Sequence, residues 1–157
     1  MPTENRKIKN ATEVSQDNIK FRSKSERMIY NTLISLGFNP EFEPERITIW
    51  EGFTPKEPLY IDGIPQMTKP KKKNINFMPK VLKFLDWHYT PDFKLTIGNQ
   101  IFYIEVKGFG NDIWPYKRKL FLKTIQDKPN VHFFEVHTKR GLLKTVKIIE
   151  DILRNDT

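Results

Sequence analysis

Tyr89-Thr90-Pro91-Asp92-Phe93 and Glu105-Val106-Lys107-Gly108 are the two stretches that decide the fold expected of this chain. Between them, residues 93–97 and 100–106 are rich in phenylalanine, isoleucine, tyrosine and valine, which favour strands. The pair Gly98-Asn99 separates these runs and is typical of a two-residue hairpin turn. The sequence therefore predicts two antiparallel strands joined by a tight turn.

This hairpin would bring three charged side chains together. If Ile97 pairs with Gln100, Asp92 lies opposite Glu105 on the neighbouring strand. Lys107 projects to the same side as Glu105, because side chains alternate between the two faces of a strand. Two opposed carboxylates destabilise a sheet by up to about 1 kcal/mol, whereas a divalent cation between them would make the pair favourable. Oxygen ligands of this kind suit Mg²⁺.

Pro91-Asp92 followed by Glu105-Val106-Lys107 resembles the motif of the PD-(D/E)XK nuclease superfamily. The larger pattern is similar to the small phage endonuclease I-type Holliday-junction resolvases, over about residues 21 to 140. The resemblance implies an α/β protein with a restriction-endonuclease-like core, in which helices flank a mixed β-sheet. It also implies a metal-dependent endodeoxyribonuclease.

The same resemblance implies the members of the active site. Asp92, Glu105 and the backbone carbonyl of Val106 would hold one or two Mg²⁺ ions, for which Mn²⁺ can substitute. Lys107 would position the attacking water. Members of the superfamily commonly carry one more acid on a preceding helix, and Glu26 matches that position.

Glu26 also has a structural interpretation. Ser23 followed three residues later by Glu26 is typical of a capping box, at the start of a helix expected at about residues 25–36. Ile29 and Leu33 follow Glu26 at helical spacing, which puts the carboxylate at the head of the buried face. The sequence leaves both roles open, and they are compatible.

Basic residues predict a polyanionic partner. The chain has 27 lysines and arginines against 19 acids, a formal net charge of +8. Cations that displace condensed counterions supply most non-specific affinity for nucleic acid, and a solvated basic surface is the alternative interpretation. The candidate DNA contacts are Lys69, Lys71, Lys72 and Lys73 in a loop, Lys117, Arg118 and Lys119 on a helix expected at 112–126, and Lys139 and Arg140 at the end of a strand expected at 131–138.

The domain organisation expected is simple. The 157 residues suit one domain. Residues 1–20 are polar, lack aromatic residues and are expected to form a flexible arm. Residues 21–157 would form the nuclease domain, with an insertion rich in proline and lysine at about 52–86 and a last helix at 142–153.

Composition excludes several classes of protein. The chain has no cysteine, which removes disulfides, thiolate zinc sites and cysteine nucleophiles and fits a cytoplasmic location. If the protein is phage-encoded, this would be the cytoplasm of the host cell. No run approaches 18 apolar residues, so we expect no membrane span.

The resemblance makes branched DNA the leading substrate. Resolution of a Holliday junction requires symmetric cuts in two strands, so we expect a homodimer. One alternative is a less selective phage nuclease that nicks or degrades duplex DNA. Another is a catalytically vestigial or partner-dependent DNA-binding subunit. The long segment between Glu26 and Asp92 departs from the compact resolvases.

Overall fold

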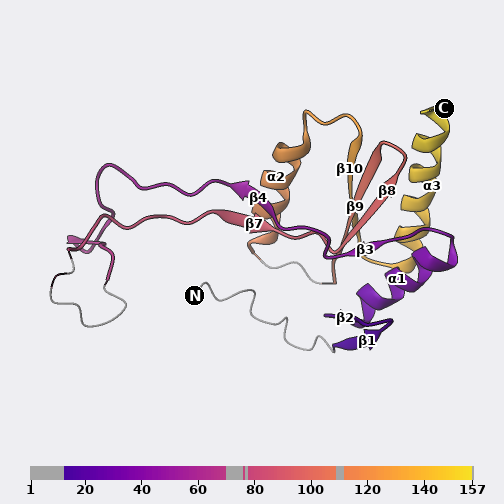
Figure 1. Cartoon of the computed structure of the whole chain (residues 1–157), viewed down its shortest axis with the longest axis horizontal. Helices are drawn as coiled ribbons and strands as arrows, with labels where there is room; N and C mark the ends of the chain where they lie inside the picture. The colour runs from indigo at the N-terminus through magenta and orange to yellow at the C-terminus, as the bar shows by residue number, and fades with distance from the viewer. Residues whose placement is uncertain (1–12, 70–75, 77, 109–111, 157) are drawn as a thin grey trace. The chain divides into compact units, whose positions relative to one another are not determined.

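The chain divides into two compact units. Residues 13–69, 76, 78–108 and 112–156 are described by a computed structural model. The first unit consists of Met1–Arg46 with Thr90–Thr157, and the second is Ile47–Tyr89. The described residues form a mixed α/β structure with three helices (Figure 1).

The first unit contains a mixed four-stranded sheet. Its strands are β3 (Glu41–Phe42), β8 (Phe93–Ile97), β9 (Gln100–Val106) and β10 (Val131–Val136), in the order β10-β9-β8-β3. β8 runs antiparallel to β9, whereas β9 and β10 are parallel. Ile97 pairs with Gln100 and Phe93 pairs with Ile104, so the predicted hairpin and its register are confirmed.

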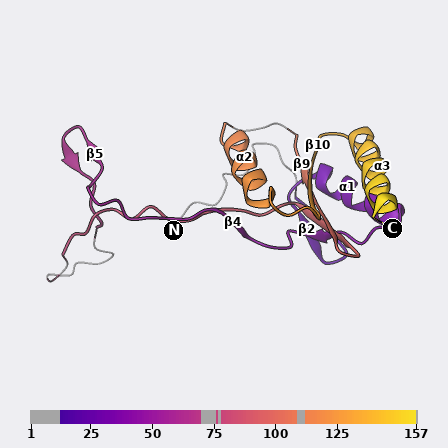
Figure 2. The same ribbon diagram turned by 90° about the horizontal axis from the view of Figure 1, so that it is seen from above.

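Helices cover both faces of this sheet. α1 (Lys24–Ser35) and α3 (Lys139–Asn155) lie on one face, and α2 (Trp114–Ile125) lies on the other (Figures 1 and 2). The core under α1 and α3 consists of Phe21, Ile29, Leu33, Phe93, Leu95, Phe102, Ile104, Val136, Leu142, Val146 and Ile149. On the other face, Phe121 packs against Tyr103 and Phe133.

The start of α3 differs from the prediction. The strand expected to reach residue 138 ends at Val136, and the helix expected from residue 142 begins at Lys139. The cause is Thr138, whose side chain accepts a hydrogen bond from the Gly141 backbone N–H at 3.0 Å and caps the helix. Lys139 and Arg140 therefore lie in the first turn of α3 and not at the end of a strand.

The N-terminal segment also differs from the prediction. β1 (Val14–Gln16) and β2 (Ile19–Phe21) form an antiparallel hairpin, so a flexible arm is wrong for residues 14–20. Asp17 and Asn18 turn the chain with positive φ angles of 51° and 62°, a backbone that these residue types tolerate. Phe21 is fully buried against the core and anchors the hairpin. Residues 1–12 of the expected arm lie outside the described part of the chain.

The second unit contains the described residues of the predicted insertion. β4 (Ile47–Trp50) pairs with β7 (Trp87–Tyr89), and β5 (Tyr60–Ile61) pairs with β6 (Ile64–Pro65), both antiparallel. Over the described ranges of both units, no helix has the length and apolar character needed to span a membrane.

Candidate active site

The hairpin brings Asp92 and Glu105 together. Asp92 directly precedes β8, and its Oδ2 accepts a hydrogen bond from the backbone N–H of Val106 at 2.7 Å. Glu105 lies near the end of β9. Asp92 is 8% exposed and Glu105 is 4% exposed, so two carboxylates meet in a buried position.

The surroundings of Asp92 oppose its ionisation. Burial raises the pKa of Asp92 well above its usual range, and the Glu105 carboxylate raises it further. The Val106 hydrogen bond and the charge of Lys107 act in the opposite direction but do not outweigh burial. Glu26 also raises the pKa of Asp92, which places its carboxylate within electrostatic reach of the pair.

Lys107 is held from two sides. Its Nζ lies 2.5 Å from Glu105 Oε1 and 4.1 Å from the centroid of the Trp114 ring. Its backbone N–H donates to the Val136 carbonyl at 2.9 Å, which fixes the chain where it leaves β9. The ammonium therefore lies between a carboxylate and an aromatic face.

Sequence reasoning missed Glu135 and Trp114. Glu135 on β10 is in register with Glu105 on β9. Its Oε2 accepts hydrogen bonds from Trp114 Nε1 at 3.1 Å and from Arg118 at 2.7 Å. Burial alone would raise the pKa of Glu135, but the hydrogen bonds from Arg118, Trp114 and His137 outweigh it and lower that pKa. No local spacing reveals this neighbour, because the parallel β9–β10 pairing depends on the crossover through α2.

Glu26 takes part in capping α1. Its backbone N–H donates to Ser23 Oγ at 3.1 Å, so the predicted N-cap is confirmed. Its Oε2 accepts from the backbone N–H of Arg22 at 2.8 Å, one residue before the capping serine. The side chain is buried, and burial raises its pKa. Glu26 is thus both a capping residue and an electrostatic neighbour of Asp92.

The basic residues of α2 differ in their surroundings. Lys117 is half-buried, and burial followed by repulsion from Lys107 lowers its pKa, while Glu105 raises it. Lys117 therefore lies within electrostatic reach of Lys107 and Glu105. Lys119 is exposed, and Arg118 is engaged with Glu135.

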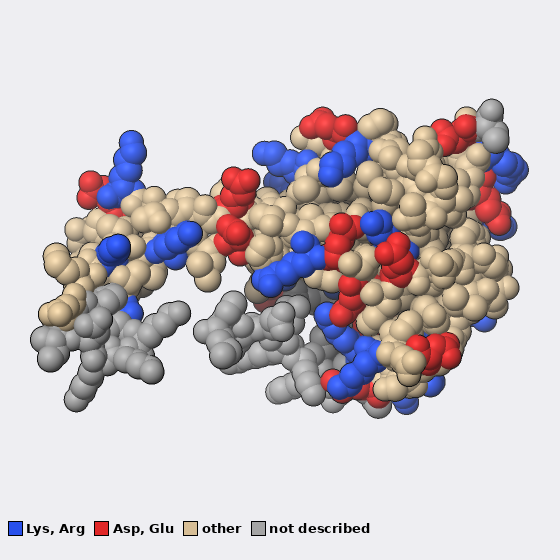
Figure 3. Space-filling model, in the orientation of Figure 1, with Lys and Arg blue, Asp and Glu red and all other residues tan. Residues whose placement is uncertain are grey.

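The remaining candidate DNA contacts are distributed over both units. Lys139 and Arg140 are exposed on α3, and Lys69 is exposed in the second unit. Lys71, Lys72 and Lys73 lie outside the described residues. On the face shown in Figure 3, lysine and arginine side chains are interspersed with acids and do not form one basic patch. Net charge alone therefore does not locate a binding surface.

The donor set at Asp92 and Glu105 fits a divalent cation. The Glu105 carboxylate disfavours the charged form of Asp92, and a cation between the two side chains would relieve that repulsion. In the part of the chain that the structure describes, no three histidine, cysteine, aspartate or glutamate side chains form a metal-holding group. Mg²⁺ is commonly held by one or two carboxylates together with substrate phosphates, and Asp92 and Glu105 suit that mode. The Val106 carbonyl and Glu26 stay predictions as further ligands.

Comparisons of this chain with protein-family models, with curated proteins and with solved structures found no match. The observed class is a mixed α/β protein with Asp92, Glu105 and Lys107 gathered at one end of a strand pair.

Proposed function

We propose that this chain is a metal-dependent endodeoxyribonuclease with a restriction-endonuclease-like core. The observation that carries the proposal is the pairing of buried Asp92 and Glu105 beside Lys107. Burial and the Glu105 carboxylate raise the pKa of Asp92 strongly, and strongly perturbed pKa values cluster at functional sites. A purely structural sheet would gain nothing from such a pair, because opposed like charges destabilise it.

Each residue has a defined role in this proposal. Asp92 and Glu105 would hold Mg²⁺ or Mn²⁺, with the Val106 carbonyl and Glu26 as further ligands. A bound ion lowers the pKa of a water and neutralises charge on the phosphate. Lys107 orients the attacking water and stabilises negative charge that develops on the phosphate oxygens.

The leading substrate is branched DNA, and the leading reaction is Holliday-junction resolution by a homodimer. This part of the proposal rests on the resemblance of Pro91-Asp92 and Glu105-Val106-Lys107 to the resolvase motif. Two symmetric cuts require two active sites, which a twofold dimer supplies.

The test compares the wild-type protein with Asp92→Asn and Glu105→Ala on a labelled four-way junction and on a matched linear duplex. Each reaction is run with Mg²⁺ and with EDTA. Glu150→Ala is the matched control, because Glu150 is exposed on α3. We expect Mg²⁺-dependent symmetric cuts near the junction by the wild type and the control, and none by the two site variants.

Other outcomes separate the parts of the proposal. Equal cutting of the duplex would keep the nuclease and discard junction selectivity. Binding without cutting would favour a vestigial or partner-dependent DNA-binding subunit. Full activity of Asp92→Asn would overturn the assigned site.

A further inference from the structure

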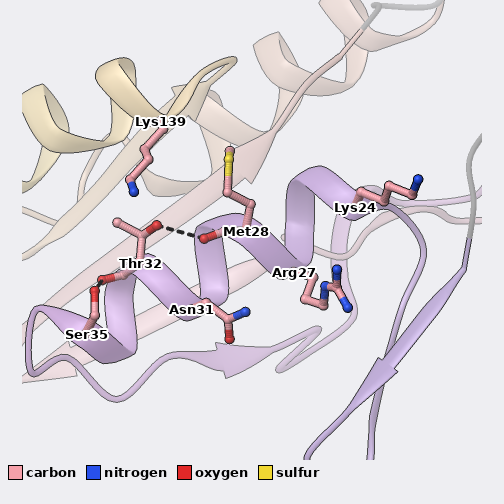
Figure 4. A pocket seen from close by; sticks show the side chains of 7 residues that line it. All are labelled: Lys24, Arg27, Met28, Asn31, Thr32, Ser35 and Lys139. Atoms are coloured by element: carbon pink, nitrogen blue, oxygen red, sulfur yellow. Dashed lines mark hydrogen bonds between the residues drawn. The ribbon is translucent and has the colours of Figure 1, made fainter.

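A basic groove lies on α1, apart from the carboxylate pair. It has a volume of about 370 Å³ and is lined chiefly by α1, with one residue from α3. The cationic residues that line it are Lys24, Arg27 and Lys139. Figure 4 shows the Lys139 side chain pointing toward Thr32 on α1. Two helices that are far apart in sequence thus place three cations around one hollow.

The three cations have no acidic partner among the residues that the structure describes. The other polar side chains of the groove are engaged within the protein. Thr32 Oγ1 donates to the Met28 carbonyl, Ser35 Oγ donates to the Thr32 carbonyl, each at 2.8 Å, and Asn31 bonds to Gln16. The donors left to face a ligand are therefore cationic, which suits an anion with several oxygens, such as a phosphodiester.

One lysine of the groove and the lysine beside the carboxylate pair follow the same end of two neighbouring strands. Val106 and Val136 are paired in the parallel β9–β10 ladder, and Lys107 and Lys139 follow them closely in the chain. Lys24 and Arg27 flank Glu26 in the first turn of α1. Lys107 lies on the α2 side of the sheet, against Trp114, and Lys139 lies on the α1 side, in the groove. A long polyanion that crosses this end of the two strands would contact both.

We propose that the groove formed by Lys24, Arg27 and Lys139 binds backbone phosphates of DNA away from the phosphate that is cut. The identity of the polyanion rests on the proposed nuclease function. The groove holds one part of the DNA while the carboxylate pair acts on another. Its cations contribute to affinity and position and do not take part in the chemical step.

The test measures binding of a labelled duplex in EDTA, where cleavage does not interfere, over a series of salt concentrations. The groove variant combines Lys24→Gln, Arg27→Gln and Lys139→Gln. The control variant combines Lys123→Gln, Lys144→Gln and Lys147→Gln, which removes the same charge from exposed positions that do not line the groove. Circular dichroism and thermal melting confirm that both variants are folded.

Each lost phosphate contact lowers the slope of log affinity against log salt by about 0.9 for B-DNA. We therefore expect the groove variant to lose about 2 to 3 from that slope, and the control variant to lose less than about 1. Equal losses of slope in the two variants would overturn the proposed DNA-binding groove. The same binding assay with duplex RNA is a second check, and a wild-type protein that binds RNA but not DNA would also overturn the proposal.

Cleavage assays in Mg²⁺ keep this inference separate from the proposed function. If the wild type cuts DNA but the groove variant binds DNA as the control does, the proposed role of the groove is wrong and the proposed nuclease activity is kept. If only the groove variant loses DNA binding but the wild type does not cut DNA, the proposed role of the groove is kept and the proposed nuclease activity is wrong.

Discussion

Lys107 Nζ lies 4.1 Å from the centroid of the Trp114 ring. Trp114 is itself held by its hydrogen bond to Glu135, which lies beside Glu105 in the parallel β9–β10 pairing. The lysine proposed to orient water is thus positioned by an aromatic residue that depends on a third acid. A cation over a tryptophan ring gains about 0.5 to 2 kcal/mol, with the larger value at desolvated sites.

Trp114 should therefore act as a positioning residue. Trp114→Leu should cut DNA about 2- to 30-fold more slowly than Trp114→Phe, because leucine fills the space but offers no aromatic face to Lys107. Both substitutions lose the bond to Glu135, so their ratio isolates the ring. Single-turnover cleavage rates measure it, with Tyr116→Leu, at a 66% exposed position on the same helix, as the control. Equal rates for Trp114→Leu and Trp114→Phe would contradict the role.

Asp92→Asn should make the metal-free protein more stable near neutral pH. The pKa of Asp92 is raised in the folded state, so the folded protein favours the protonated side chain. The contribution of Asp92 to stability is therefore fully present below the unfolded pKa of about 3.9 and is lost as pH rises through the folded-state pKa. Asparagine does not ionise and escapes that loss. The gain should be on the order of 1 kcal/mol, the cost of two opposed like charges.

Thermal midpoints in EDTA, measured from about pH 4 upward, check this prediction. The difference between Asp92→Asn and the wild type should grow with pH. Asp127→Asn removes the same charge from an exposed position and is the control. Parallel behaviour of the two variants would show that Asp92 is not penalised in the folded state.

Substitutions of Glu26 and Ser23 should distinguish a role in capping α1 from a role in cleavage. Glu26→Gln keeps an oxygen that can accept from the Arg22 N–H but removes the charge near Asp92, so it should abolish most cleavage with little loss of stability. Ser23→Ala removes the cap and should cost about 1 kcal/mol of stability while the folded protein still cuts. Denaturant unfolding and cleavage rates are measured for both. Undiminished cleavage by Glu26→Gln would leave Glu26 with capping alone.

Lys117 should matter more for cleavage than Lys119. Lys117 is half-buried and lies within electrostatic reach of Lys107 and Glu105. Lys119 lies two residues further along α2 and is exposed. Lys117→Gln should slow cleavage by about tenfold or more, because a charge close to the reacting phosphate is lost. Lys119→Gln should change the rate by less than about twofold. The reverse order would remove Lys117 from the site.

Local signals in the sequence were sufficient for some elements and not for others. The β8–β9 hairpin follows from Gly98-Asn99 and the strand-favouring residues on either side of it, and the start of α1 follows from Ser23. The predicted start of α3 was wrong because a threonine at this position can continue a strand or cap a helix, and Thr138 caps the helix. The β1–β2 hairpin was missed because its strands are only three residues long.

By itself, the sequence determined that Asp92 and Glu105 face each other, because a two-residue turn sets the register of the strands on either side of it. Only the tertiary structure decided that Glu135 lies beside Glu105 and that Lys139 joins Lys24 and Arg27. The physical reason is that these neighbours meet through a parallel crossover and through helix packing. Both depend on how the whole core is buried and not on the spacing of nearby residues.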